Sequence, residues 1–532
     1  MTLFNLYSSV KKLKELAQKP FDLTNPESFN PKRIEDMCVE NEHFKLLFAT
    51  EKVDEEVLNT LFKLCEEADV FNKMKAMQSG EVLNFIEGFE SENRSVLHTA
   101  MRDFFEDQNQ GEKAKEATKE ALVENQKLKA FIEENEKNER FQHLVVVGIG
   151  GSELGAKALA VAMEHYNKPN RTLHFVSNVD PDNAAKVAES IDLNKTLVAS
   201  ISKSGGTLET LTNEALMRHH FEKKGLDPKG HFIVVTGKGS PLDDEKRYLE
   251  RFYIWDFIGG RYSVTSMVGG IPLAFCLGYS QFEEILKGAS FMDKHALNIT
   301  DPKKNLPLMS ALLGLWNRSF LEHPTVAIIP YSQALGRFAA HLQQLDMESN
   351  GKRIDKKGQS VDFDTGPIIW GEPGTNAQHS FFQMLHQGTT PVPIEFISFK
   401  ESQYGDDLEV QGSLSHEKLL SNMFAQSMAL ANGHKNENPN KNFPGNRPSR
   451  ILLSKKLDPF TVGALLAYYE HKVAFQGFIW NINSFDQEGV QLGKVLANQM
   501  IDLFAKQRGK ESKDYKSVPT GEAYLKHLAS IK

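Results

Sequence analysis

Short apolar runs alternate with helix-length segments in two successive series, and this alternation constrains the fold more than any other feature of the chain. Strands separated by helices form parallel sheets, because each connecting helix packs back onto one face of the sheet. The sequence therefore predicts an α/β protein with two doubly wound parallel-sheet halves. The expected strands are 143–148, 172–176, 197–202, 231–236 and 252–256 in the first half, and 326–330, 368–370, 394–399 and 451–453 in the second.

The segments outside these two series are expected to be helical or irregular. The N-terminal part is charged and helix-rich, while residues 432–450 are almost wholly polar with three prolines and predict a long exposed loop. We expect an N-terminal helical segment at 1–138 that packs on the large domain, α/β domains at 139–290 and 291–510, and a C-terminal tail at 511–532.

The segment SKSGGTLET, which follows the third expected strand, is rich in hydroxyl groups and precedes an expected helix at 209–221. The free N–H groups and the dipole of a helix N-terminus favour an anion. Lys203 is the only cation in the segment, so neutral donors would dominate, which suits a phosphate monoester better than a polyanion. An ordinary N-cap with a glycine turn is the alternative for this loop alone. The candidate side-chain donors are Ser202, Lys203, Ser204, Thr207 and Thr210.

A second loop, GIGGS at 148–152, follows the first expected strand. It is not a dinucleotide-binding fingerprint, because the third glycine of that motif would fall at Glu153, whose charge would oppose a pyrophosphate. It is not a P-loop either, because Ala156 and Lys157 stand where that motif requires Lys and Ser or Thr. The sequence thus predicts a loop for a single phosphate that includes Gly151 and Ser152.

Composition excludes several classes of function. The net charge of −8 and a pI near 6.1 argue against nucleic-acid binding. Three scattered cysteines provide neither a disulfide framework nor a metal-binding pair, and the N-terminus lacks the apolar region of a signal peptide, so we expect a cytoplasmic protein. The longest apolar tract, 462–480, is interrupted by Glu470, His471 and Lys472, which predicts a core helix and not a membrane span.

Four further motifs stand between residues 259 and 494: GGRYSVTS, QQLDMESNGK, GEPGTNAQHSFFQMLHQG and SFDQEGVQLGK. In this order, and together with the two loops, they resemble the glucose-6-phosphate isomerase (phosphoglucose isomerase) family from about residue 140 to about residue 500. The resemblance implies two sugar isomerase-type domains and an enzyme of glycolysis and gluconeogenesis. It also implies that the enzyme interconverts glucose 6-phosphate and fructose 6-phosphate without a metal or an organic cofactor.

The reaction implied by the resemblance moves a proton between C1 and C2 through a cis-enediol(ate), so it needs a base, a cation and a ring-opening acid. The family pattern assigns the base to Glu348 and the cation that faces the enediolate to Arg261. It places Lys494 near the ring oxygen and C1. Spacing alone favours a surface helix residue for Glu348, and the flanking motif reverses this preference; the alternatives for Arg261 and Lys494 are a structural salt bridge and a solvated lysine on a helix face.

Two histidines compete for the ring-opening role. The family pattern selects His379, which stands 31 residues after the base, and leaves His386 as a structural residue. In this family the histidine enters the active site of the neighbouring subunit, so the resemblance implies an obligate homodimer. It also implies that Gln344 and Gln487 line the site together with the phosphate donors.

The chain departs from the family pattern at Gly205, Gly206, Leu208 and Gln491, which predicts an altered phosphate affinity with the same reaction. A sugar-phosphate sensor without catalysis is one alternative function, and an isomerase of mannose 6-phosphate or an amino sugar phosphate is another. An amidotransferase-linked isomerase would need an N-terminal cysteine, whereas Cys38 is internal.

Overall fold

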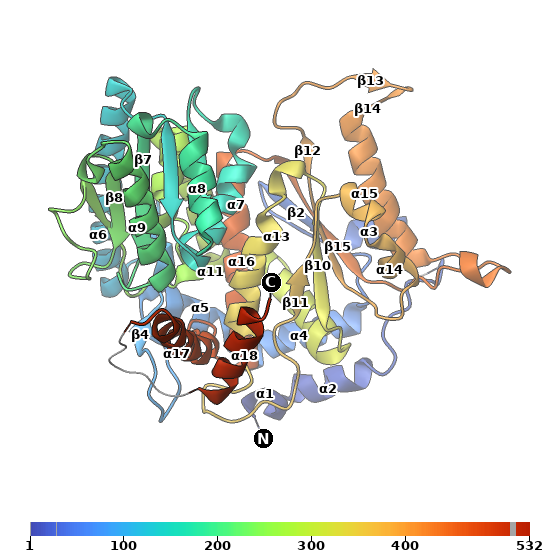
Figure 1. The fold of residues 1–532 in the computed structure, drawn as a ribbon. Coiled ribbons are helices and arrows are strands. Elements are labelled where there is room, and N and C mark those ends of the chain that lie inside the picture. Colours follow the sequence, from blue (N-terminus) through green and yellow to red (C-terminus); the bar gives the residue numbers. More distant parts are fainter. Residues whose placement is uncertain (1, 28, 511–517, 532) are drawn as a thin grey trace. The chain divides into compact units, whose positions relative to one another are not determined.

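The computed structural model describes residues 2–27, 29–510 and 518–531 (Figure 1). The chain divides into two compact units, Met1–Ser484 and Phe485–Lys532. The predicted strands of both halves lie in the first unit, which contains one five-stranded and one six-stranded sheet. The predicted α/β class is therefore confirmed.

The first sheet consists of five parallel strands in the order β6-β5-β7-β8-β9. The chain moves outward from β5 in one direction to β6 and then in the other direction from β7, so the switch point lies between β5 and β7. Ligands of doubly wound sheets bind at such a point, beyond the carboxyl ends of the strands. The strands are β5 (His143–Val147), β6 (Thr172–Val176), β7 (Thr196–Ser202), β8 (Phe232–Thr236) and β9 (Glu250–Tyr253).

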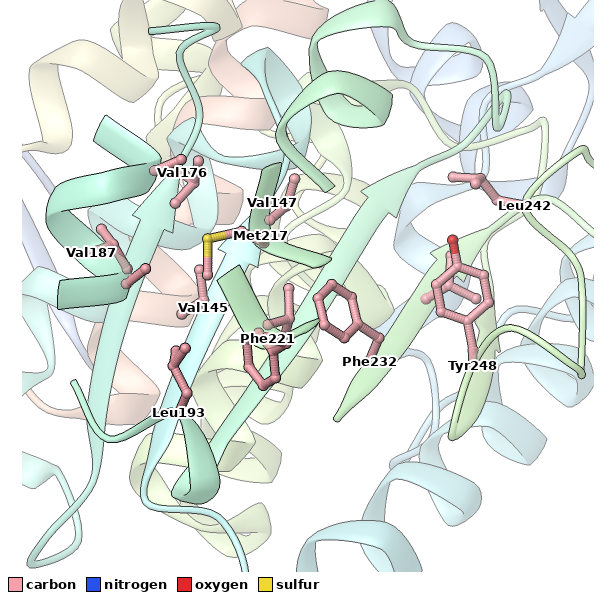
Figure 2. Close-up of a cluster of buried hydrophobic side chains, with 14 residues drawn as sticks. Val145, Val147, Val176, Val187, Leu193, Met217, Phe221, Phe232, Leu242 and Tyr248 are labelled. Carbon is pink, nitrogen blue, oxygen red and sulfur yellow. The ribbon is translucent and has the colours of Figure 1, made fainter. Parts of the chain in front are cut away.

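Helices cover the first sheet and form its core with the strands. Figure 2 shows Val145 and Val147 of β5 together with Met217 and Phe221 of helix α9, and all four side chains are buried. β7 is buried along its whole length, as the continuous apolar run of a central parallel strand predicts. The helices of this half are α6 (Glu112–Asn138), α7 (Leu154–Ala162), α8 (Pro181–Ser190), α9 (Leu208–Lys223), α10 (Met267–Leu277) and α11 (Tyr279–Asn298).

The second sheet has six strands in the order β1-β2-β15-β12-β10-β11. The last four of these run parallel, with a second switch point between β10 and β12, while β2 pairs antiparallel with β15 and β1 with β2. The strands are β1 (Cys38–Glu40), β2 (Phe44–Leu47), β10 (Thr325–Pro330), β11 (Ile368–Trp370), β12 (Ile394–Glu401) and β15 (Ser449–Lys456).

β1 and β2 are two short strands in residues 1–138, which the sequence predicts to be helix-rich. Both strands are too short to show a clear period of two. β2 is stabilised by pairing with β15, for example Leu47 opposite Ile451, and β1 pairs with β2 at the edge of the sheet. The remaining N-terminal elements are α1 (Leu3–Leu6), α2 (Ser8–Leu16), α3 (Pro31–Asp36), α4 (Glu55–Glu67), α5 (Val70–Ser79), β3 (Val82–Asn84) and β4 (Arg94–Ser95).

The predicted core helix is α16 (Pro459–Trp480), which is buried on all sides and packs against α11 and α12. Its charged residues are neutralised inside the protein, since Glu470 accepts a hydrogen bond from Arg102 at 2.6 Å. Within the described ranges, no helix has the length and apolar character needed to cross a bilayer. The other elements here are α12 (Leu306–Leu315), α13 (Phe338–Leu342), α14 (Phe382–Gln387), α15 (Ser415–Asn432), β13 (Glu409–Val410) and β14 (Ser413–Leu414).

The expected exposed loop at 432–450 is only partly correct. Residues 435–444 are exposed, but Gly445 and residues 447–450 are buried. Arg447 donates a hydrogen bond to the carbonyl of Gly388 at 2.6 Å, and Ser449 begins β15. Polar side chains at the buried end form hydrogen bonds and ion pairs inside the protein, such as that of Arg450 with Glu51, and composition alone does not reveal this.

The second unit contains α17 (Gln491–Gln507) and α18 (Pro519–Ala529). Leu503 and Leu525 are buried within it, and a Cβ at Gly521 would lie 2.5 Å from the sulfur of Met500. The expected tail at 511–532 includes α18, while residues 511–517 and 532 lie outside the described residues. The domain boundaries after residues 138, 290 and 510 stay predictions.

Candidate active site

The two predicted phosphate loops leave neighbouring strands of the first sheet at its switch point. Val147 of β5 is in register with Ser200 of β7, so both strands end at the same edge. After β5 the chain forms a short 3-10 turn, η2 (Gly150–Ser152), with Gly150 at φ +59°, a conformation that glycine adopts without strain. The strand order therefore brings together the two loops that the sequence predicts to bind phosphate.

The loop after β7 leads directly into α9, whose first N–H groups have no partner within the helix. Within the described part of the chain the Thr207 side chain does not cap this helix; its hydroxyl lies 2.9 Å from the hydroxyl of Ser202 instead. The Thr210 hydroxyl is buried and has no hydrogen-bond partner among the described residues. Thr207 therefore does not act as an ordinary side-chain N-cap, and the anion-binding role of these hydroxyls stays a prediction.

The two glycines of this loop, Gly205 and Gly206, differ in their surroundings. Gly205 has φ +66°, and a Cβ there would lie 2.7 Å from the hydroxyl oxygen of Ser240, so the turn requires glycine. A Cβ on Gly206 would meet no described atom within 4 Å. Ser204 is exposed, and its hydroxyl accepts a hydrogen bond from the N–H of Gly206 at 3.3 Å.

Lys203 ties this loop to the chain that leads to the arginine motif. Its ammonium donates a hydrogen bond to the carbonyl of Ile258 at 2.8 Å, and burial lowers the pKa of the lysine. The lysine therefore has a structural partner in addition to any role in phosphate binding.

The loop GIGGS at 148–152, called the glycine loop here, also contacts the arginine motif GGRYSVTS at η6 (Gly260–Tyr262). A Cβ at Gly151 would lie 2.3 Å from the carbonyl carbon of Gly260, and Ser263 is within hydrogen-bonding distance of the Gly151 carbonyl at 3.2 Å. A Cβ at Gly155 would lie 2.3 Å from Val264, so this glycine permits the close approach of α7. Arg261 is thereby held next to the candidate phosphate loops.

Arg261 and Glu348 form an ion pair at 2.9 Å, although they are 87 residues apart in sequence. The arginine side chain is 1% exposed and that of the glutamate 24% exposed. The same guanidinium donates to the Ser349 hydroxyl at 2.6 Å and to the Ser484 carbonyl at 2.6 Å. A carboxylate that reaches solvent beside a fixed buried cation can accept a proton from a ligand while the cation stabilises developing negative charge.

Glu348 ends a π-helical segment, η9 (Gln343–Glu348), which continues from α13. Such segments are rare and frequently occur at functional sites. Gln344 belongs to the same segment, and its Nε2 would lie 3.4 Å from a Cβ at Gly150. One irregular helix therefore supplies the carboxylate beside Arg261 and an amide beside the glycine loop.

The remaining predicted residues lie on other elements of the chain. His379 is exposed at the end of η10 (Asn376–His379), whereas His386 is hydrogen-bonded at 2.7 Å to Gln426. Lys494 is exposed on α17 in the second unit, and Gln487 precedes the short turn η12 (Glu488–Val490) of the same unit. Their roles stay predictions.

Sequence reasoning missed three residues next to this pair. Ser349 and Tyr262 directly follow Glu348 and Arg261 in their motifs, so adjacency in the motif was the available signal. Asp346 lies two residues before Glu348, and burial raises the pKa of its carboxyl to about 6 against the opposing effect of Lys472. Across the described residues, no three His, Cys, Asp or Glu side chains come together as a metal site.

Comparisons with known proteins agree with the arrangement of these motifs. A sequence model of the family described as phosphoglucose isomerase matches residues 47–520. The glucose-6-phosphate isomerase of Protochlamydia amoebophila is 58% identical over 98% of this chain and 96% of its own length, and that of Chlamydia caviae is 52% identical over 99% and 98%. The crystal structure of a glucose-6-phosphate isomerase from Chlamydia trachomatis superposes with a TM-score of 0.94 at 49% identity and covers 99% of both chains.

Proposed function

Because this chain belongs to the phosphoglucose isomerase family, we propose that it is an aldose–ketose isomerase that interconverts glucose 6-phosphate and fructose 6-phosphate. The observation that carries the proposal is the 2.9 Å pair of Glu348 and Arg261 beside two phosphate-type loops. The chain extends over nearly the whole length of relatives that are named for this activity.

The loops after β5 and β7 would bind the 6-phosphate. The unpaired N–H groups at the start of α9 and the hydroxyls of Ser202, Thr207 and Thr210 supply neutral donors, and the helix dipole favours the dianion. Ser152, Ser204 and Lys203 complete the proposed set. Anchoring the phosphate converts the proton transfer at the other end of the sugar into a reaction of a pre-oriented substrate.

Glu348 would act as the base. In the direction from aldose to ketose, its carboxylate takes the proton from C2 of the open-chain sugar, electrons move toward the carbonyl oxygen at C1, and an enediolate forms. Arg261 remains cationic and stabilises that oxygen without removing the proton. Glu348 then returns the proton to C1 while the hydroxyl proton on O2 passes to O1 and C2 becomes the carbonyl, so atoms and charge balance over the cycle.

Ring opening requires a separate proton donor and acceptor, because the pyranose has to open before C2 becomes acidic. We assign this role to His379 and place Lys494 near the ring oxygen and C1. His379 is exposed in the single chain, which suits a residue that completes the site of a neighbouring subunit in a homodimer. Gln344 and Gln487 would line the same site, and the cysteine content favours a cytoplasmic location.

A coupled assay tests the proposal directly. Purified protein is given fructose 6-phosphate, glucose 6-phosphate formation is followed with a dehydrogenase in the presence of EDTA, and mannose 6-phosphate and glucosamine 6-phosphate are run in parallel. EDTA-resistant turnover of fructose 6-phosphate alone is expected. Binding without turnover would instead identify a sensor, and turnover of another sugar phosphate would change the assigned substrate.

A further inference from the structure

We propose that Ser349 and Tyr262 are positioning residues that hold the Arg261 guanidinium in the orientation used by the reaction. This inference rests on the proposed roles of Glu348 and Arg261. Neither hydroxyl is expected to touch the substrate, so both would act through the arginine.

Among the described contacts, acceptors on Ser349, Glu348 and Ser484 hold the guanidinium from different sides. Its Nε donates to the Ser349 hydroxyl at 2.6 Å, one terminal nitrogen to Glu348 at 2.9 Å and the other to the carbonyl of Ser484 at 2.6 Å. A guanidinium is planar with its donors in a fixed fork, so acceptors at Nε and at both terminal nitrogens define the plane and its rotation. Arg261 is 1% exposed, and solvent water is therefore a poor substitute for a lost acceptor.

Ser349 has a special place in this arrangement because it is the next residue after the base. Arg261 contacts both Glu348 and Ser349, and Tyr262, the next residue after the arginine, lies 3.1 Å from the Ser349 hydroxyl. The consecutive residues Arg261 and Tyr262 thus contact the consecutive residues Glu348 and Ser349. A hydroxyl can accept from both the guanidinium and the phenol, and the second contact restricts the rotation of the serine.

Tyr262 is itself held rigidly. Its ring lies against that of His98, with the ring centroids 4.7 Å apart, and His98 in turn faces the buried carboxylate of Glu470 at 3.9 Å. Burial raises the pKa of the phenol to about 12, so Tyr262 keeps its proton at working pH and can donate it toward Ser349.

This geometry separates the orientation of Arg261 from the binding of the substrate phosphate. The phosphate would be held by the loops after β5 and β7, whereas the Ser349 hydroxyl contacts Arg261, the group that would stabilise the enediolate. A displacement of about 1 Å at a reacting group can cost about 100-fold in rate. Loss of the serine hydroxyl should therefore lower kcat while leaving KM within about threefold.

The test is a double-mutant cycle on the full chain. Ser349→Ala is expected to lower kcat by about 10- to 100-fold, and Tyr262→Phe by less. Because Tyr262 acts through Ser349, the double variant should match Ser349→Ala within about twofold. Independent reductions of kcat that multiply in the double variant would overturn the inference, and so would a rise in KM with unchanged kcat.

Matched variants separate positioning from general destabilisation. Ser349→Thr keeps the hydroxyl and is expected to recover most of kcat. Ser449→Ala removes a different buried hydroxyl, which lies 3.0 Å from those of Thr50 and Ser427, and should lower the melting temperature without changing kcat. If Ser449→Ala lowers kcat as strongly as Ser349→Ala, positioning is refuted.

A reference variant separates failure of this inference from failure of the proposed function. If Glu348→Gln retains full turnover, the assigned base is wrong and the inference falls with it. If Glu348→Gln is inactive while Ser349→Ala has normal kcat, only the positioning role is wrong. Should Ser349→Ala not fold, Tyr262→Phe decides the question, and a normal kcat for that variant overturns the inference.

Discussion

A Cβ added to Gly151 would lie 2.3 Å from the carbonyl carbon of Gly260, because the backbone of the glycine loop rests directly on that of the arginine motif. The two glycines are more than 100 residues apart in sequence. Their contact sets the separation between the candidate phosphate loop and Arg261, so it determines how a bound sugar phosphate lies relative to the proposed catalytic pair.

Gly151→Ala should disrupt this contact. The new methyl group meets backbone, which cannot move aside as a side chain would, so we expect a loss of about 1–3 kcal/mol in unfolding free energy. We also expect kcat/KM to fall by about 10-fold or more, because the loop and the arginine are pushed apart. Urea unfolding and the coupled assay measure both effects. Gly230→Ala is the control, since its Cβ would lie 3.5 Å from the nearest atom, of Arg140; equal behaviour of the two variants would contradict the argument.

Glu348→Gln should abolish turnover while leaving binding largely intact. The amide keeps the size of the side chain but cannot accept the substrate proton, and removal of a general base lowers kcat by about 10²–10⁴-fold. The coupled assay gives kcat, and titration calorimetry with fructose 6-phosphate gives the affinity. Glu222→Gln, on the exposed end of α9, serves as the charge-matched control and should behave as the parent protein. Unchanged turnover in Glu348→Gln would refute the assigned base.

Subunit mixing tests the proposed position of His379. If this histidine completes the partner's site, a heterodimer of one His379→Ala subunit and one Glu348→Gln subunit contains one site in which both residues are intact. Coexpression in equal amounts then gives about half heterodimers with one active site of two, and about a quarter of normal activity, although each variant alone is inactive. If His379 acts within its own chain, the mixture stays inactive.

Acid should destabilise the protein through Glu395. This buried carboxylate contacts Arg450, Lys472 and, at 3.1 Å, the hydroxyl of Tyr469. Although burial opposes the charged form, the two cations hold its pKa down to about 2 from an ordinary 4.5. The unfolded chain therefore takes up a proton first, and stability present above pH 4.5 is lost as the pH falls toward 2.

The loss from Glu395 should be on the order of 2–3 kcal/mol. Urea unfolding at pH 5.5 and at pH 3 measures it. Glu395→Gln should be less stable at pH 5.5, because the buried cations of Lys472 and Arg450 each lose an ion pair while Arg450 keeps Glu51, and should show a smaller drop between the two pH values. An equal drop in both proteins would show that Glu395 is not responsible.

Much of the fold was predictable because its strands are short apolar runs bounded by helices. The expected strands 172–176 and 368–370 coincide with β6 and β11, and the tract at 462–480 lies within α16. β1 and β2 were missed because strands of three and four residues have little periodic signal and depend on their pairing in the sheet, β2 with β15 and β1 with β2.

The order and content of the motifs were sufficient to identify the family and to propose Glu348, Arg261, His379 and Lys494, since such motifs are local runs of sequence. Only the tertiary structure decided which of these side chains meet. The parallel order of β5 and β7 joins the two loops, and the π-helical segment before Ser349 brings Glu348 to within 2.9 Å of Arg261. Contacts between residues 87 positions apart depend on how sheets and helices pack, and that packing is a property of the whole folded unit and not of any local run of residues.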